Sequence, residues 1–255
     1  MNSFIDSHAH IYDEYYDNID LVLDNANKNG INIVINSGCD HKSNIEVLEK
    51  SNNYSNMYAT LGIHPEFAND YRLDDLIYIK NNVNNPKVVA IGEIGLDYHY
   101  EGYNKEKQIE LFKKQLDIAK EVNLPVVIHS RDATLDTINI LKSYPTVTGV
   151  IHSFSGSMQT AKEYIKMGYL LGINGVLTFK NAKIKDVISE IGIENIILET
   201  DSPYLTPEPY RGKKNESSNI LYIANYLENL LNIPLETISK ITNNNINRLF
   251  KIKTR

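Results

Sequence analysis

Two histidines near the start of the chain have the spacing of metal ligands. Phe4 and Ile5 lead into Asp6, and His8 and His10 follow with one residue between them. In an extended chain, residues two apart point to the same side, so both imidazoles would face one point in space. Imidazole nitrogens are common ligands of zinc and related ions. The pair alone also fits a surface strand with a polar end, so further ligands must come from elsewhere.

Five of the seven histidines and two carboxylates follow short apolar runs of the sequence. These residues are His8, His10, His64, Glu93, His129, His152 and Asp201. Histidine and carboxylate sets hold Zn²⁺, Mn²⁺ or Mg²⁺, and one carboxylate can bridge two ions. Each histidine taken singly is compatible with an ordinary polar residue at the end of a strand. Their joint placement favours a metal centre.

The apolar runs themselves predict eight strands. The runs are centred near residues 5, 33, 60, 90, 127, 149, 171 and 197. Continuous apolarity is typical of strands buried on both faces of a parallel sheet. Stretches with helical apolar periodicity lie between many of these runs, near residues 19–26, 109–119, 135–141, 157–165, 184–191, 220–227 and up to 250. The alternation favours a (β/α)8 TIM barrel, with a doubly wound open sheet as the alternative.

A barrel would bring these polar residues together, because its catalytic mouth lies at the carboxyl ends of the strands. Arg131 and Asp132 also follow a predicted strand, and we expect them to form a structural ion pair. We expect Glu199 to support the loop after the eighth strand, and Asp6 to fix the orientation of a histidine.

Several other residues near the predicted mouth have a plainer interpretation. Tyr12, Tyr98 and Tyr204 are able to stack on unpaired bases, but packing is the better interpretation in a chain with 17 tyrosines. His41 and His99 are expected to be ordinary loop histidines.

Composition limits the class of protein. The chain has 255 residues, 42% of them hydrophobic and 23% charged, which predicts one globular domain over residues 1–255. The net charge of −6 argues against a protein that coats long duplex DNA. It does not argue against an enzyme on nucleic acid, because bound divalent cations supply local positive charge.

The sequence also predicts a cytoplasmic location. Cys39 is the only cysteine, which excludes an intramolecular disulfide and favours a reducing compartment, and we expect it to be a small packing residue. We find no signal peptide and no apolar run near the roughly 18 residues of a membrane span. No membrane association and no obligate protein partner are expected.

Taken in order, the motifs at the strand ends resemble those of the TatD family. The matching motifs are residues 6–10, 62–65, 92–97, 152–154 with Gly156, 199–205, Pro207, 211–213, Asn215 and 248–250. This family of amidohydrolase-like, metal-dependent hydrolases contains Mg²⁺-dependent deoxyribonucleases. The resemblance therefore implies a two-metal phosphodiesterase acting on DNA, often as a 3′–5′ exonuclease on single-stranded ends, in DNA repair or DNA degradation during cell death.

The resemblance also implies roles for individual residues. His8, His10 and Asp201 would hold one ion, His129 and His152 the other, and Glu93 would bridge the two. Asp201 would also orient the attacking water or accept its proton, and His64, Arg211 and Lys213 would contact phosphate oxygens. The sequence departs from the family pattern at Tyr12 with Asp13, Glu66 and Ser217, but at none of the proposed ligands.

Two other functions remain open on the sequence alone. One is an amidohydrolase-type enzyme that cleaves a C–N or ester bond in a small metabolite. Such enzymes often bridge their metals with a modified lysine, whereas this chain offers Glu93. The other is a non-catalytic module that binds metal or nucleic acid, against which the complete set of ligands argues.

Overall fold

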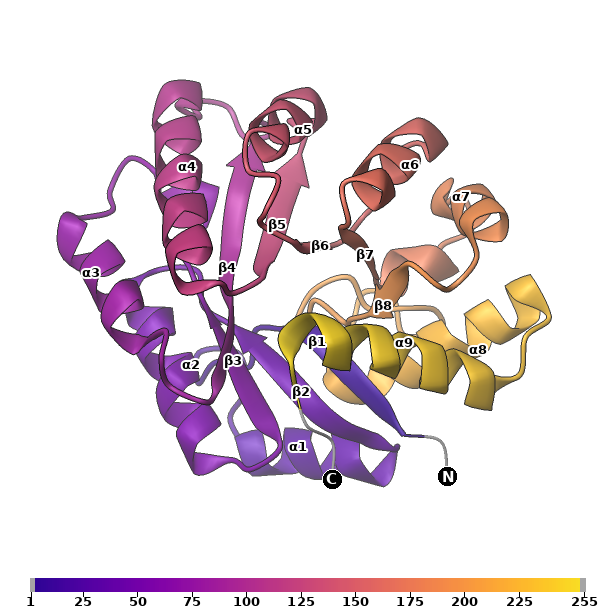
Figure 1. Ribbon diagram of the computed structural model, residues 1–255. Coiled ribbons are helices and arrows are strands. Elements are labelled where there is room, and N and C mark those ends of the chain that lie inside the picture. Colours follow the sequence, from indigo (N-terminus) through magenta and orange to yellow (C-terminus); the bar gives the residue numbers. More distant parts are fainter. Residues whose placement is uncertain (1–2, 253–255) are drawn as a thin grey trace.

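The predicted strands form one parallel sheet whose order follows the chain. The computed structural model describes residues 3–252, and within them an eight-stranded sheet runs in the order β1 to β8 (Figure 1). The strands are β1 (Phe4–Ala9), β2 (Ile31–Ser37), β3 (Met57–Leu61), β4 (Val88–Asp97), β5 (Val126–Arg131), β6 (Gly149–Ile151), β7 (Leu170–Ile173) and β8 (Ile196–Leu198). Helices lie outside the curved sheet, so the prediction of a (β/α)8 barrel is confirmed.

The barrel closes through residues at the polar ends of its first and last strands. Ala9 and Ser202 form a parallel bridge, with Ser202 located just beyond β8. The backbone N–H of Asp201 donates to the carbonyl of His8 at 2.9 Å, and that of His10 donates to the carbonyl of Ser202 at 2.7 Å. The contact that joins the two strands therefore contains three of the predicted metal ligands.

The helices cover the outer face of the sheet, and most lie where the sequence predicts them. They are α1 (Ile19–Lys28), α2 (His41–Asn53), α3 (Leu73–Asn82), α4 (Lys105–Val122), α5 (Thr134–Lys142), α6 (Met158–Lys166), α7 (Ile184–Ile191), α8 (Ile220–Leu231) and α9 (Leu235–Phe250). Short 3₁₀ turns span Pro65–Phe67, Gly175–Thr178 and Ser217–Asn219. Helices α2 and α3 were not predicted. Within residues 3–252, no helix has both the length and the apolar character needed to cross a bilayer.

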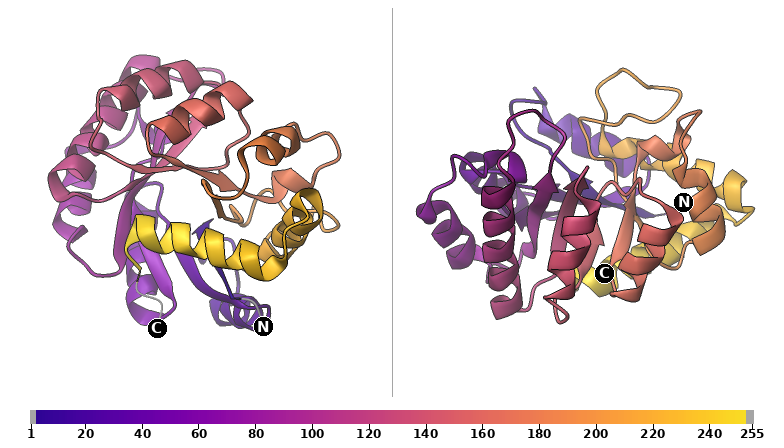
Figure 2. Two further views of the ribbon diagram at one scale, coloured as in Figure 1. Left: turned by 45° about the vertical axis from the view of Figure 1, so that its right-hand side comes forward. Right: turned by 90° about the horizontal axis from the view of Figure 1, so that it is seen from above.

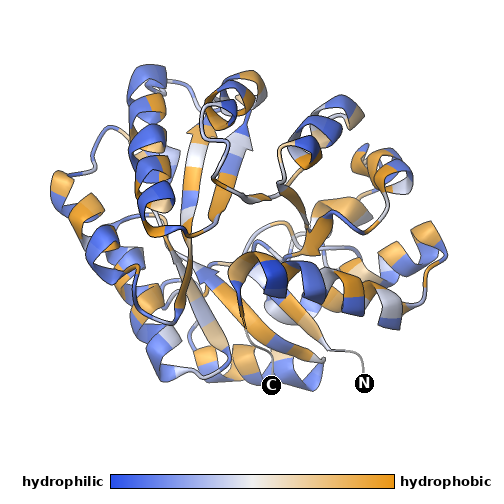
Figure 3. Ribbon diagram, viewed as in Figure 1, coloured by the Kyte–Doolittle hydropathy of each residue, from blue (hydrophilic) through white to orange (hydrophobic). Residues whose placement is uncertain are grey.

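Neighbouring residues of several strands belong to different apolar clusters. In β5, Val126 and Ile128 join the larger cluster with the surrounding helices, whereas Val127 joins a smaller cluster inside the barrel. Figure 3 shows strands with many apolar residues and helices in which polar and apolar residues alternate. The pattern in β5 is the two-residue period of an extended strand, applied to a sheet that is buried on both faces.

Helix α9 closes the barrel at the amino-terminal ends of the strands. Its side chains Ile246 and Phe250 pack with the interior cluster, which also contains Ile5, Val127 and Ile197. Figure 2 (left) shows the helix, in yellow, lying across the ring of strands. The opposite, carboxyl-terminal end is the one that carries the predicted metal ligands.

Candidate metal centre

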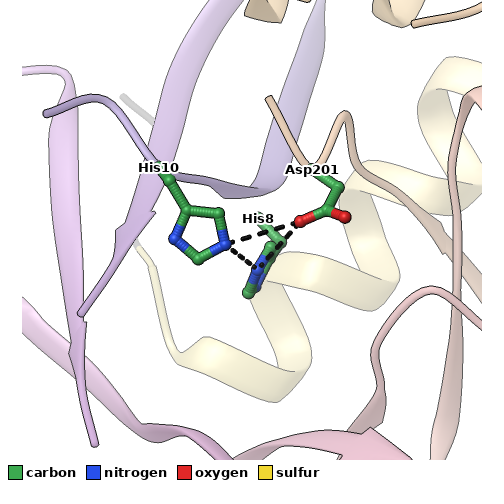
Figure 4. A group of neighbouring side chains, drawn as sticks. All are labelled: His8, His10 and Asp201. Carbon is green, nitrogen blue, oxygen red and sulfur yellow. Dashed lines mark hydrogen bonds and ion pairs between the residues drawn. The ribbon is translucent and has the colours of Figure 1, made fainter. Parts of the chain in front are cut away.

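Four side-chain atoms meet at the closure of the barrel. The Nε2 atoms of His8 and His10 lie 3.1 Å apart, and Oδ1 of Asp201 is 3.6 Å and 3.4 Å from them (Figure 4). Oε2 of Glu93 is 3.3 Å from Nε2 of His8 and 3.6 Å from that of His10. Ligands about 2.0–2.2 Å from a tetrahedral zinc ion are separated from each other by roughly 3.3–3.5 Å. The two nitrogens and the Asp201 oxygen therefore fit around one divalent cation, and the Glu93 oxygen lies beside the two histidines.

A second set of nitrogens surrounds the other oxygen of Glu93. Oε1 lies 2.9 Å from Nδ1 of His129, and 3.8 Å from Nε2 of both His64 and His152. Nε2 of His152 is also 3.5 Å from Oδ1 of Asp201, so this histidine lies between the two sets. A carboxylate with one oxygen directed to each set is the arrangement expected of a bridge between two ions.

The grouping of the histidines differs in one respect from the expected one. Ligand atoms of His64, Glu93 and His129 lie within 4.8 Å of one another, and so do those of His8, Glu93 and His152. His129 is thus closest to His64, which was expected to contact phosphate. Shared coordination of one ion by His129 and His152 stays a prediction.

Strand periodicity and two glycines bring these side chains together. His129 and His152 come two residues after Val127 and Val150, which face the barrel interior, so both rings point into the mouth. Gly95 has φ +144°, and a Cβ there would lie 1.9 Å from the His129 carbonyl. A Cβ on Gly62 would lie 2.6 Å from the backbone of Gly92. Only glycine allows β3, β4 and β5 to approach so closely around Glu93.

Each of four histidines uses its second ring nitrogen to contact an orienting partner. The contacts are His8 Nδ1 to Ser37 Oγ at 3.0 Å, His10 Nδ1 to the Tyr12 hydroxyl at 2.9 Å, His129 Nε2 to Asp97 Oδ2 at 2.9 Å, and His152 Nδ1 to Glu199 Oε1 at 2.9 Å. Such partners fix the tautomer and the orientation of a metal-binding imidazole. The rings are therefore held in place by the protein itself.

The electrostatics of the cluster favour added positive charge. Burial raises the pKa of Glu93, but the charges of His152 and His8 outweigh it and hold that pKa well below its usual range. Burial lowers the pKa of His152, whereas Glu199, Asp201 and Glu93 raise it to a net value of about 10. The three carboxylates thus favour the protonated, positively charged form of the buried His152. Divalent cations would compensate the same negative charge, so the residues present fit a site for two ions.

Comparison with known proteins identifies the family. The sequence model of the protein family "TatD related DNase" matches residues 5–251 of this chain. The chain belongs to the TatD-related DNase family. A *Bacillus subtilis* relative, the uncharacterized metal-dependent hydrolase YabD, is 42% identical over 97% of this chain and 98% of its own length. The protein is therefore a metal-dependent hydrolase of this family.

Solved structures of TatD proteins have the same fold. YjjV, a TatD homolog from *Escherichia coli* K12, superposes with a TM-score of 0.94 at 30% identity, covering 98% of both chains. A TatD family hydrolase from *Entamoeba histolytica* superposes with a TM-score of 0.84 at 28% identity, again over 98% of both chains. The barrel fold is thus shared along nearly the whole chain.

Two expectations about neighbouring residues are wrong. Asp6 contacts no histidine ring within residues 3–252: its oxygens accept from the Thr200 N–H at 2.9 Å and the Thr200 hydroxyl at 2.6 Å, and burial raises its pKa to about 7. It therefore fixes the loop that carries Asp201. Arg131 and Asp132 form no ion pair in the described chain, because Asp132 lies 2.8 Å from His99 Nδ1 and Arg131 donates to the Tyr100 hydroxyl at 3.2 Å.

Three orienting residues of this TatD-related site were missed from the sequence. Ser37 ends β2, one of the two strands to which no site residue was assigned, so the rule that led to the histidines would also have indicated it. Asp97 lies within a quoted motif but was given no role. Tyr12 was expected to pack or to stack on bases, whereas its ring is buried and its hydroxyl meets His10. Glu199 was expected to support the loop after β8, but its carboxylate contacts His152 and the Ser153 N–H, which follow β6.

The metal cluster forms the floor of a cavity of about 770 Å³. Glu93, His129 and Asp201 line it, and Lys42 and Arg131 are the cationic side chains in its walls among the described residues. Arg211 and Lys213 do not line it: the Arg211 guanidinium lies 4.2 Å from the Phe179 ring centroid, and Lys213 Nζ lies 5.4 Å from that of Tyr210. Their predicted contact with phosphate is therefore not made from inside the cavity.

Proposed function

We propose that this protein is a metal-dependent deoxyribonuclease that hydrolyses phosphodiester bonds of DNA as a 3′–5′ exonuclease on single-stranded ends. The observation that carries the proposal is the position of Glu93, whose two oxygens face two sets of histidines in a chain of the TatD-related DNase family. Paired ions suit the in-line displacement of a phosphodiester, because they stabilise both the attacking and the leaving oxygen. We further propose that residues 1–255 form one hydrolase domain.

Two divalent ions, Mg²⁺, Mn²⁺ or Zn²⁺, would activate water and neutralise phosphate charge when bound. His8, His10 and Asp201 would hold one ion, His129 and His152 the other, with Glu93 between them. Burial raises the pKa of Asp201, but the charge of His152 and the contact with His10 lower it below its usual value. The carboxylate is thus ionised at neutral pH, which suits it to hold an ion and to orient the attacking water, whereas the lowered pKa makes it a weak acceptor of the water's proton.

The remaining side chains of the mouth suit phosphate binding. Burial and the charge of His129 lower the pKa of His64 to about 3, so its imidazole is neutral and able to donate one hydrogen bond to a phosphate oxygen. We add Arg131 to the predicted phosphate ligands, because it lines the cavity and its planar guanidinium suits phosphate oxygens. Arg211 and Lys213, which lie on the loop after β8, stay predicted contacts for a more distant phosphate.

The charge and size of the site support a strand end as the substrate. Proteins that hold long duplex DNA neutralise many phosphates, whereas this chain has a net charge of −6 and two cationic side chains in the described cavity wall. A cavity of about 770 Å³ falls in the range that holds one small ligand. We further propose a cytoplasmic location, consistent with a single cysteine, Cys39.

The test is a metal-dependent cleavage assay on single-stranded DNA, duplex DNA and RNA, each labelled at the 5′ end. We expect progressively shorter products from single-stranded DNA, loss of cleavage in a chelator, and recovery when Mg²⁺, Mn²⁺ or Zn²⁺ is added. Asp201→Asn should lower kcat by about 10²–10³-fold without unfolding the protein. Glu190→Gln is the matched control, because its carboxylate pairs with Lys162 on the outer surface.

Four results would overturn the proposal. Normal DNA cleavage in a chelator, or by Asp201→Asn, would exclude the assigned metal site. Turnover of a small amide or lactone without cleavage of DNA would favour an amidohydrolase-type enzyme. Full function of a Glu93→Ala protein would favour a non-catalytic binding module.

A further inference from the structure

An aromatic ring stands at the mouth of the barrel beside the metal cluster. Tyr204 lines the cavity and is 50% exposed, three residues after Asp201. Its ring centroid lies 6.3 Å from that of His10, with the planes at 65°. A large exposed aromatic side chain this close to the proposed reaction centre leaves apolar surface where substrate must pass.

The protein holds this ring in a fixed position. The Tyr204 hydroxyl lies 2.8 Å from that of Tyr15, whose ring stacks on Tyr12 with centroids 5.5 Å apart. The Tyr204 N–H donates to the Asp201 carbonyl at 2.8 Å, and its own carbonyl accepts from the Asn215 side chain at 2.6 Å. Because the hydroxyl already has a protein partner, what remains for a ligand is the ring surface. A ring ordered in advance also loses little conformational entropy on binding.

A fixed aromatic surface beside a phosphodiesterase centre suits one kind of ligand, a flat unpaired base. Every base has a π-face, so stacking binds single strands with little dependence on sequence. In a duplex the base faces are covered by their neighbours, whereas the last base of a single strand is free on one side. We propose that Tyr204 stacks on the terminal base of the substrate strand and thereby positions the adjacent phosphodiester. This inference rests on the proposed deoxyribonuclease function.

Two other exposed tyrosines are less suited to this role. Tyr100 also lines the cavity, but the Arg131 guanidinium lies over its ring at 5.2 Å from the centroid. Tyr210 lies on the same loop as Tyr204, and its hydroxyl is likewise paired with a tyrosine, Tyr222, at 3.1 Å. Tyr210 is 37% exposed but does not line the cavity, which makes it a matched control.

The experiment compares kcat/KM for two single-stranded oligonucleotides, one with a normal 3′-terminal nucleotide and one with an abasic residue at that position. The wild-type protein should prefer the normal end by about ten- to a hundredfold. Tyr204→Ala should lose this preference by reduced activity on the normal end, with little change on the abasic end. Tyr204→Phe should keep it, and so should Tyr210→Ala.

The design separates stacking from a merely structural role. Tyr204→Phe removes the hydroxyl contact with Tyr15, so a structural role would lower its activity on both substrates. Tyr204→Leu keeps most of the bulk and serves if the alanine variant unfolds; it too should lose the preference. A preference retained by Tyr204→Leu, or an equal loss on both substrates, would overturn the inference alone. Absence of cleavage of any DNA by the wild-type protein would instead overturn the proposed function, and this inference with it.

Discussion

The two ends of the barrel are built from the same strands and filled in opposite ways. At the amino-terminal end, Val127 of β5 packs with Ile246 and Phe250 of α9 in an apolar cluster. Two residues further along the same strand, His129 contacts Glu93 and Asp97 instead. The side chains point the same way, so the difference lies only in residue type. One end is closed by burial of apolar surface, and the other concentrates charge.

This contrast separates stability from chemistry. Burial of apolar side chains is the main favourable contribution to folding, and the end closed by α9 provides it. Buried carboxylates and imidazoles cost folding free energy unless their charges are compensated. A ligand that binds only the folded state stabilises that state. We therefore expect divalent ions bound at the open, carboxyl-terminal end to raise the melting temperature of the protein. Variants at the closed end should therefore lower stability and keep activity, whereas variants at the open end should lower activity.

The largest effect is expected from Glu93→Gln at the open end. The change keeps the shape but removes the charge that faces both sets of histidines, so kcat/KM on single-stranded DNA should fall by about 10³-fold. Urea unfolding in a chelator should show a lower free energy of unfolding than that of the wild type, because the depressed pKa of Glu93 means that its charge stabilises the fold at neutral pH and compensates the buried His152. Wild-type kcat/KM per folded molecule, measured below the melting temperature of the variant, would mean that Glu93 is only structural.

Phe250→Ala tests the closed end. The side chain is 3% exposed and packs in the interior cluster, so its removal should lower the free energy of unfolding by about 3–5 kcal/mol. Activity per folded molecule should stay at the wild-type level, measured below the melting temperature of the variant. A large fall in kcat with little change in stability would show that α9 influences the metal centre and does more than close the amino-terminal end of the barrel.

A smaller effect is expected for Glu199→Gln, which acts on the cluster through another residue. Its carboxylate lies 2.9 Å from His152 Nδ1 and also accepts from the Ser153 N–H at 2.7 Å. Loss of such a partner typically costs 10–100-fold in metal affinity or activity. Titration with Mn²⁺ in a calorimeter would measure the affinity directly. An Mn²⁺ affinity equal to that of the wild type would show that Glu199 does not support metal binding.

The smallest effect is expected away from both ends. Lys162 on α6 pairs with Glu190 on α7 at 3.2 Å, and both side chains are well exposed. Lys162→Ala should change the free energy of unfolding by less than about 0.5 kcal/mol and leave kcat/KM unchanged. A change above about 1 kcal/mol would show that the outer helix layer contributes more than the comparison of the two ends assumes.

The sequence predicted the barrel well because buried parallel strands leave a strong pattern. All eight strands lie where the apolar runs indicated. Helices α2 and α3 were missed for a physical reason: the buried face of α2 includes Ser43, Asn44 and Ser51, and α3 buries Asp75 while exposing Leu73. Their inner faces lack a continuous apolar stripe, so helical periodicity gave no signal.

The candidate site was predictable in its members but not in its contacts. The rule that strand ends meet at one mouth found His8, His129 and Glu93 without any knowledge of distances. It could not tell that His129 would lie nearest His64, or that Asp132 would pair with His99. Those contacts depend on side-chain rotamers and loop paths, which strand periodicity does not encode.

The bridge between Ala9 and Ser202 has a consequence for the order in which the protein is made. His8 and His10 leave the ribosome first, but Asp201 and the segment that pairs with them follow almost two hundred residues later. An incomplete chain that ends before β8 therefore holds the first two ligands without the third. Complete synthesis and docking of the last strand are built-in conditions for assembling the metal centre, so nascent fragments lack it.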